Sequence, residues 1–338
     1  MAALSESEHR RHAVAAEEDV GALRRAVARM AAGQHAVRPG VAELVATELG
    51  TNLLRHAHPG GYVLARKAGD GIELLSVDHG PGMTAAALAS SPVALPSSRG
   101  GGLKAGLSVV RRNAAEFDWY ATRRGTVVYA RLGAPAPAGH TGWLFGGVNV
   151  PLGGDGESGD AWAVAPGSRT AALVVDGLGH GPGAAAAARA AITTFDGAAV
   201  TDLDRLVRHT HEAMRATRGG VLGASLIDPG RGELAYAAVG NITGRVLTRG
   251  RSVHLLDRPG TLGTQLTLPA VRLQHGPWEP GSNLILVSDG IRSAWSLEDH
   301  PGLLDHHPAI IAAVLHREYG RATDDATVLV VRQVTAMA

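Results

Sequence analysis

The chain has 338 residues, of which 45% are hydrophobic and 19% charged, a composition typical of a globular protein with about two domains. The net charge is only +1, so the composition shows no sign of binding to nucleic acid or to an acidic membrane surface. The absence of Cys excludes disulfides, thiolate metal sites and a cysteine nucleophile, and with a polar N-terminus and no long apolar segment we expect a cytoplasmic protein without a membrane anchor.

The first part of the chain predicts helices that alternate with short strands. Apolar residues at helical spacing predict three helices, and alternating residues between Gly-rich turns predict four strands. The expected helices are residues 20–32, 41–56 and 103–115, and the expected strands are residues 62–67, 72–78, 117–122 and 126–132. We expect an α+β sandwich in which the helices cover one face of a mostly antiparallel sheet.

A linker is predicted at Gly133-Ala-Pro-Ala-Pro-Ala-Gly-His-Thr-Gly142. Alternating Pro and small residues form neither helix nor sheet and favour an extended spacer. The predicted organisation is therefore one domain at residues 1–133, a linker at 134–142 and a second domain at 143–335.

The second part of the chain predicts more strands than the first, with helices between them. The expected strands are residues 160–165, 170–176, 222–228, 233–239, 244–247, 271–275, 283–288 and 326–333. Three helices are expected: one that begins after Pro182, one at residues 202–217 and one at residues 308–319. This number of strands with flanking helices predicts two packed sheets.

A candidate nucleotide site begins on the helix at residues 41–56. Glu48, Asn52 and His56 share one face of this helix, where a Glu and an Asn one turn apart can hold a divalent ion and a water molecule. By itself this pattern is more typical of a solvated helix face. Two later motifs favour the nucleotide hypothesis: Asp78-His-Gly-Pro-Gly82 at a strand end, and Ser97-Ser-Arg-Gly-Gly-Gly-Leu-Lys-Ala-Gly-Leu107 at a helix start, where free N–H groups favour phosphate.

The order of these motifs resembles the GHKL ATPases, and within them the anti-sigma-factor and stressosome switch serine kinases of bacteria. The resemblance covers residues 15–133 and implies bound ATP with Mg²⁺. It implies that Asn52 ligates Mg²⁺, that Glu48 is the general base and that Asp78 binds the adenine amino group. It also implies an adenine pocket and a phosphate lid, formed by Gly80, Gly82, Gly100, Gly101, Gly102 and Gly106, with Thr126 near the base.

In the second part, acidic residues stand at strand ends. Asp160 begins a strand, Asp176 and Asp289 follow apolar runs, and Asp324-Asp325 precede the last strand. Asp-Gly turns explain such residues one at a time. If the strands are neighbours, however, the carboxylates converge and need cations, and hard oxygen donors favour Mg²⁺ or Mn²⁺. Two such ions can bind a phosphate and activate a water molecule for in-line attack.

These motifs resemble the metal-dependent PPM-type serine/threonine phosphatases of the sporulation and stress-response branch, over residues 143–333. The matching segments are Ser158-Gly-Asp, Val175-Asp-Gly-Leu-Gly-His-Gly, Ala238-Val-Gly-Asn-Ile242, Val287-Ser-Asp-Gly-Ile and Asp324-Asp-Ala-Thr-Val-Leu-Val. The resemblance implies an α-β-β-α sandwich in which Asp176 bridges two metal ions, the Gly177 carbonyl binds one, and Asp160 orients the attacking water. Asp289 and Asp324 would complete the coordination of the second ion, with Asp325 as the alternative to Asp324. His180 either touches the substrate phosphate or packs within its loop.

We therefore predict a bacterial signalling protein in which an ATP-binding, kinase-like domain precedes a phosphatase of phosphoserine or phosphothreonine in proteins. The family resemblance implies an anti-sigma-antagonist partner of the STAS type. An alternative is an N-terminal domain that binds ATP and clamps a sigma factor or antagonist without phosphate transfer. A third hypothesis is a degenerate phosphatase fold that acts as a scaffold, against which the intact acidic set argues.

Overall fold

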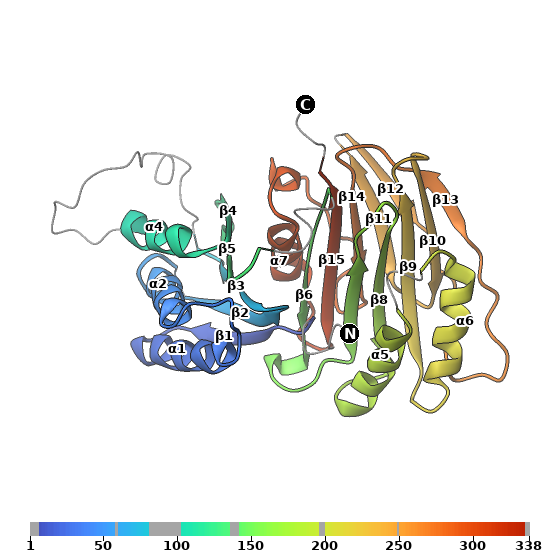
Figure 1. The fold of residues 1–338 in the computed structure, drawn as a ribbon, viewed down its shortest axis with the longest axis horizontal. Helices are drawn as coiled ribbons and strands as arrows, with labels where there is room; N and C mark the ends of the chain where they lie inside the picture. Colours follow the sequence, from blue (N-terminus) through green and yellow to red (C-terminus); the bar gives the residue numbers. More distant parts are fainter. Residues whose placement is uncertain are drawn as a thin grey trace. The chain divides into compact units, whose positions relative to one another are not determined.

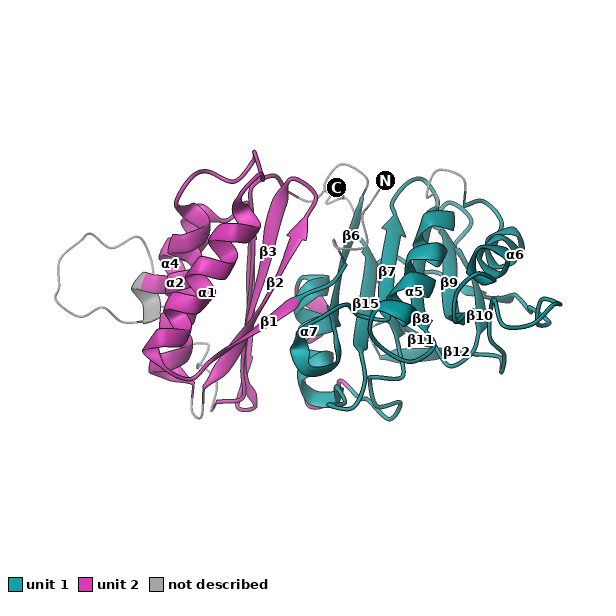
Figure 2. Cartoon of the chain, turned by 90° about the horizontal axis from the view of Figure 1, so that it is seen from below, with its two compact units in different colours: residues 1–9, 136–296, 307–338 teal, residues 10–135, 297–306 magenta. Residues whose placement is uncertain are grey.

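The computed structural model describes residues 7–57, 60–80, 103–135, 142–195, 200–248 and 250–334, and for residues 103–105 only the backbone. The chain divides into two compact units (Figure 2). Unit 1 comprises Met1–His9, Ala136–Ser296 and His307–Ala338, and unit 2 comprises Arg10–Pro135 and Leu297–His306. Within the described ranges, no helix is long and apolar enough to cross a membrane.

Unit 2 is a single five-stranded sheet with helices on one face. Its strands run in the order β1-β2-β3-β5-β4, and every neighbouring pair is antiparallel. The elements are β1 (Arg10–Val14), α1 (Glu17–Ala31), α2 (Val41–His56), β2 (Gly61–Ala68), β3 (Gly71–Asp78), α4 (Leu103–Asn113), β4 (Glu116–Thr122) and β5 (Gly125–Leu132). The sandwich predicted from the sequence is confirmed.

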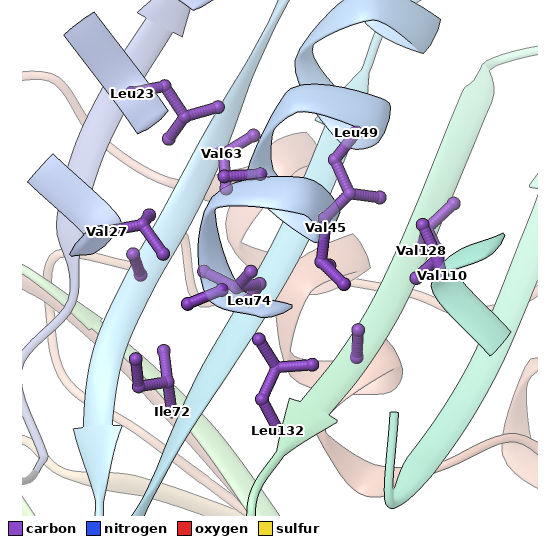
Figure 3. Packing of buried hydrophobic residues seen from close by; sticks show 14 of the residues in the cluster. Leu23, Val27, Val45, Leu49, Val63, Ile72, Leu74, Val110, Val128 and Leu132 are labelled. Atoms are coloured by element: carbon purple, nitrogen blue, oxygen red, sulfur yellow. The ribbon is translucent and has the colours of Figure 1, made fainter. Parts of the chain in front are cut away.

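The core of unit 2 lies between this sheet and its helices. Helix α2 buries Val45, Leu49 and Leu53, which are four residues apart and therefore on one face. Figure 3 shows Val45 and Leu49 above Leu74 of the sheet, within one apolar cluster. Burial of this face leaves the neighbouring polar stripe of α2, with Glu48 and Asn52, at the edge of the core, where it can bind a ligand.

Unit 1 consists of two packed sheets with helices outside them (Figure 1). The strand orders are β13-β10-β9-β8-β7 and β12-β11-β14-β15-β6, again antiparallel. The strands are β6 (Trp143–Val150), β7 (Asp160–Ala165), β8 (Thr170–Gly177), β9 (Gly220–Asp228), β10 (Glu233–Val239), β11 (Thr243–Thr248), β12 (Arg251–Leu255), β13 (Gln274–Pro277), β14 (Asn283–Val287) and β15 (Ala326–Gln333). The helices are α5 (Pro182–Thr194), α6 (Leu203–Met214) and α7 (Pro308–Tyr319).

The layers of unit 1 follow the α-β-β-α order expected from the sequence. Between the sheets, Val174 and Tyr236 of one sheet meet Leu286 and Leu329 of the other in one apolar cluster. A second cluster joins α5 and α6 to the outer face of the first sheet, and α7 packs on β6 and β15. The two sheets therefore hold the ends of their strands in a fixed relation, which positions the acidic residues at those ends.

Several strands were not predicted from the sequence. Strands β1 and β12 are sheet edges of five residues with mostly polar sequences, so they lack the apolar alternation that predicts a strand. Strand β6 contains Gly146 and Gly147, which lower β propensity. Strand β13 was expected at residues 271–275 and lies at Gln274–Pro277.

The structural units assign two short segments differently from the sequence-based domain limits. In unit 1, the backbone N–H of His9 donates to the Asn149 carbonyl at 2.7 Å, and Glu8 accepts a hydrogen bond from the Ser158 N–H at 3.0 Å. In unit 2, the ring Nδ1 of His306 lies 3.0 Å from the carboxylate of Asp118. These hydrogen bonds join residues far apart in sequence, and composition does not reveal them.

Leu49→Ala should destabilise unit 2 by about 2–5 kcal/mol, because it leaves a cavity where a fully buried side chain packs against the sheet. The measurement is urea unfolding of the full chain. Leu44→Ala on the same helix is the matched control, since Leu44 is 41% exposed and its truncation should change the free energy of unfolding little. Equal effects of the two substitutions would contradict this packing.

Candidate active site

Strand pairing brings the acidic residues of unit 1 together. Asp160 and Asp176 are directly opposite each other on β7 and β8. Asp289 follows β14 and Asp324 precedes β15, and these two strands are also neighbours, with Val287 opposite Val328. The hydroxyl of Ser288 donates to Oδ2 of Asp160 at 2.6 Å and so connects the ends of the two sheets. The carboxylates that the sequence predicted to converge therefore lie in one region.

The absence of a side chain at Gly290 allows two backbone segments of this region to pack closely against each other. A methyl group added to Gly290 would lie 1.9 Å from the carbonyl oxygen of Asp325, a distance that no side chain can adopt. The backbone N–H of Arg321 also donates to the Gly290 carbonyl at 2.7 Å. The turn after Asp289 is therefore held against the turn that contains Asp324, and glycine is required for this contact.

The mutual repulsion of these carboxylates is visible in their pKa values. Burial, followed by the charges of Asp160, Asp289, Asp324 and Asp325, raises the pKa of Asp176 to about 9. Burial also raises the pKa of Asp160 to about 7. The pKa of Asp324 is raised by burial and by the charge of Asp289, and the charge of His180 opposes this rise. In the absence of cations, the cluster favours protonated carboxyl groups.

Asp324 and Asp325 are adjacent in sequence but have different surroundings. Asp325 is buried and accepts two backbone hydrogen bonds of 2.6 Å, from Leu152 to Oδ1 and from Gly159 to Oδ2. Asp324 is only partly buried and accepts a hydrogen bond from the N–H of Asp325. Both oxygens of Asp325 are thus engaged with the backbone, whereas Asp324 retains acceptor capacity.

Two polar residues that the sequence analysis gave no role support the acidic cluster. Nδ2 of Asn241 donates to Oδ2 of Asp289 at 2.9 Å, and Asn149 donates to the carbonyl of Asp160 at 2.8 Å. Asn241 lies in the Gly240-Asn241 segment quoted above, so its motif was visible although its partner was not. Asn149 lies in strand β6, which was not predicted.

The acidic cluster fits hard divalent cations in donor type and in charge. Its side-chain donors are carboxylate oxygens, the type that Mg²⁺ and Mn²⁺ prefer, and its raised pKa values indicate negative charge without a counterion. Within the described ranges, no three Asp, Glu or His side chains are arranged so that together they could hold a metal ion. The cluster thus provides the charge and the chemistry of a metal site, and the Gly177 carbonyl lies on the same strand as Asp176.

In unit 2, helices α2 and α4 bring three of the expected nucleotide residues together. Glu48 and Asn52 are one turn apart on α2, and Gly106 of α4 packs against both. A methyl group added to Gly106 would lie 2.7 Å from Oε2 of Glu48 and 3.1 Å from Oδ1 of Asn52. Nδ2 of Asn52 is buried and has no hydrogen-bond partner within the described ranges, so it can donate to a ligand.

A second group of expected residues lies where β3 ends. Oδ1 of Asp78 accepts hydrogen bonds from the N–H groups of Gly80 at 2.8 Å and Thr126 at 3.2 Å. The hydroxyl of Thr126 is buried, and no described group hydrogen-bonds to it. Asp78, Gly80 and Thr126 are therefore together as the resemblance implied. Gly82, Gly100, Gly101 and Gly102 lie outside the described residues.

Family models match both parts of the chain. Residues 166–334, half of the chain, match the model of stage II sporulation protein E (SpoIIE). The chain belongs to the SpoIIE family. Residues 13–132 match the histidine kinase-like ATPase domain. The protein thus combines a histidine kinase-like ATPase domain with a SpoIIE-type PP2C phosphatase domain, and both resemblances drawn from the sequence are confirmed.

Several solved structures are similar to parts of this SpoIIE-family chain. One similar structure is described as belonging to the bacterial stressosome, a modular system that has been adapted to control secondary messenger signalling. It is 29% identical to this chain, with a TM-score of 0.52, and the match covers 56% of this chain and 99% of that chain. RsbX in complex with magnesium is 20% identical with a TM-score of 0.48, and the match covers 56% of this chain and 94% of RsbX. The PP2C phosphatase domain of SpoIIE from Bacillus subtilis, with a fragment of its regulatory domain, is 17% identical with a TM-score of 0.49. The match covers 96% of this chain and 99% of that chain. A comparison with curated proteins gave no match.

Metal-free protein should lose stability as the pH rises from about 4 to about 9. The folded-state pKa of Asp176 is raised above its ordinary value of 3.8, so the folded state binds more protons than the unfolded state in this window. One such proton contributes a slope of up to about 1.4 kcal/mol per pH unit. Thermal unfolding in a chelator across this pH range measures the slope, and Asp176→Asn should make it shallower.

Asp228→Asn is the matched control, because Asp228 also ends a strand but lies beside Arg169 and outside the acidic cluster. Saturating Mn²⁺ should remove most of the slope in the unsubstituted protein by compensating the carboxylates. A slope that Asp176→Asn leaves unchanged would show that the acidic cluster does not cause it.

Proposed function

We propose that residues 143–335 form a phosphatase that depends on divalent cations and hydrolyses phosphoserine or phosphothreonine in a protein. The observation that carries the proposal is the convergence of Asp160, Asp176, Asp289 and Asp324, with the pKa of Asp176 raised to about 9 by burial and by these neighbours. The SpoIIE family match and the PP2C-like fold support it. A scaffold without activity would have no need for mutually repelling carboxylates at this point.

Each residue of the cluster receives a role in this proposal. Asp176, the Gly177 carbonyl, Asp289 and Asp324 would hold two Mg²⁺ or Mn²⁺ ions, which would compensate the charge of the phosphate and acidify a water molecule. Asn241 orients Asp289 by its hydrogen bond to Oδ2.

Asp160 and Asp325 are given supporting roles. The carboxylate of Asp160, held by the hydrogen bond from the Ser288 hydroxyl, would orient the attacking water. Asp325 holds the amides of Leu152 and Gly159, and so fixes the turn that presents Asp324.

Asp324→Asn and Asp325→Asn should separate these two roles. Asp324→Asn should lower Mn²⁺-dependent hydrolysis of p-nitrophenyl phosphate more than about 100-fold without loss of thermal stability, because it removes a metal ligand from a repelling cluster. Asp325→Asn should lower the free energy of unfolding by about 1–3 kcal/mol, because its amide nitrogen replaces one of the two oxygens that accept backbone hydrogen bonds and cannot accept one itself. Excess chelator should abolish activity in the unsubstituted protein, and activity that persists there contradicts the metal assignment.

We further propose that the ATPase domain, residues 1–133, binds ATP with Mg²⁺ and transfers phosphate to a Ser or Thr of a partner. Asn52 would hold Mg²⁺, Asp78 would accept from the adenine amino group with Thr126 beside it, and Glu48 would act as general base. The buried polar atoms of Asn52 and Thr126 that have no described partner support a polar ligand at both places.

The partner we propose is an anti-sigma antagonist of the STAS type in the cytoplasm. The match to the sporulation protein family and the similarity to a stressosome-related structure support the assignment. One chain would then contain both the kinase-like and the phosphatase activity, so nucleotide and metal supply would together set the phosphorylation level of the partner.

Glu48→Gln should abolish phosphate transfer from labelled ATP to a purified STAS-domain protein of the same genome, by about 100-fold or more, because it removes the base. ATP binding, measured by calorimetry, should stay unchanged, whereas Asn52→Ala should weaken it. Glu43→Gln is the control on the same helix. If the unsubstituted protein binds ATP but transfers no label, the domain is an ATP-dependent binding module for a sigma factor or antagonist.

A further inference from the structure

Arg218 lies in a turn that is hydrogen-bonded to the segment after Asp176. It is in the turn between α6 and β9, where the Thr217 hydroxyl accepts a hydrogen bond from the Gly219 N–H at 3.0 Å. The Gly219 carbonyl in turn accepts the N–H of Leu178 at 2.9 Å. The turn that contains Arg218 is thus joined directly to the segment that follows Asp176.

The guanidinium of Arg218 lies against two glycines of the loop that follows Asp176. A methyl group added to Gly183 would lie 2.6 Å from Nε and 2.7 Å from Cζ of Arg218, and one added to Gly179 would lie 3.5 Å from Nη1. Gly177 is also opposite Gly220 in the register of β8 and β9. The absence of a side chain at Gly183 therefore makes the space that the guanidinium occupies, close to the end of β8.

The positive charge of Arg218 is exposed, and within the described ranges no carboxylate forms an ion pair with it. Arg215, three residues earlier, differs in this respect, because it pairs with Glu212 at 3.2 Å. Arg218 is thus an exposed guanidinium without a carboxylate partner that lies against the loop after Asp176. Such a position suits an anion that approaches the cluster from solvent.

We propose that Arg218 binds the phosphate group of the phosphorylated substrate, an inference that rests on the phosphatase function proposed above. A phosphate dianion that approaches Asp176 and its neighbours is repelled by their charge, and positive charge near the phosphate lowers this repulsion. The planar guanidinium donates two parallel hydrogen bonds to phosphate oxygens and supplies positive charge from the protein side. Arg218 is therefore a substrate-binding residue for the phosphate, whatever peptide sequence carries it.

The test uses the full chain loaded with Mn²⁺ and compares Arg218→Ala, Arg218→Lys and the control Arg215→Ala. For p-nitrophenyl phosphate and a phosphoserine peptide, Arg218→Ala should raise KM about tenfold or more and change kcat much less, since it removes charge-assisted hydrogen bonds. Arg218→Lys should recover part of the loss, because it retains the charge but not the planar fork. Arg215→Ala should behave as the unsubstituted protein.

Calorimetric titration with inorganic phosphate adds a readout that needs no turnover. Arg218→Ala should weaken phosphate binding by a similar factor and leave the rise in melting temperature caused by Mn²⁺ unchanged. Unchanged KM and phosphate affinity in this variant overturn the inference while the phosphatase function stands, and so does a loss of the Mn²⁺ effect on melting, which indicates a structural role. An unsubstituted protein that binds phosphate through Arg218 but hydrolyses neither substrate contradicts the proposed function alone.

Discussion

The repulsion among carboxylates at the ends of two packed sheets is the constraint on which the active region of unit 1 depends. Negative charges do not gather spontaneously, so the fold must hold them. The apolar layer between the sheets provides the rigidity, and the Ser288–Asp160 hydrogen bond connects the two ends. Gly290 removes the side chain that would otherwise separate Asp289 from Asp324. The free energy of packing thus maintains an arrangement whose repulsion positive charge, such as that of divalent cations, would offset.

The two domains share one physical property. Each contains polar or acidic groups whose charge or hydrogen-bonding capacity the described residues do not satisfy. In the phosphatase domain it is a group of carboxyl groups that burial and mutual repulsion keep from ionising, and Arg218 lies against the loop that follows Asp176. In the ATPase domain it is the buried amide nitrogen of Asn52 and the hydroxyl of Thr126. Buried polar groups without partners are costly, so their presence at the places that the family motifs mark indicates ligand binding.

Much of this organisation could be predicted because local patterns carry it. Apolar spacing in the helix of Val45 and Leu49 predicted its buried face, and apolar runs predicted the strands that end at Asp176 and Asp289. The strands that escaped prediction are two polar edges and the glycine-containing β6, where pairing with a neighbouring strand overrides a weak local preference. The short segments at residues 7–9 and 297–306 escaped for the same reason, since distant hydrogen bonds assign them to their units.

The sequence by itself determined the order of the two domains, the acidic character of the second site and the residues available for it, because motif order and residue chemistry are properties of the linear chain. Only the tertiary structure distinguished Asp324 from Asp325, since the difference is that two distant amides occupy the oxygens of Asp325. It also revealed that Asn241 supports Asp289 and that Arg218 lies against Gly183. These relations join residues far apart in the chain, and they exist only after the strands have paired.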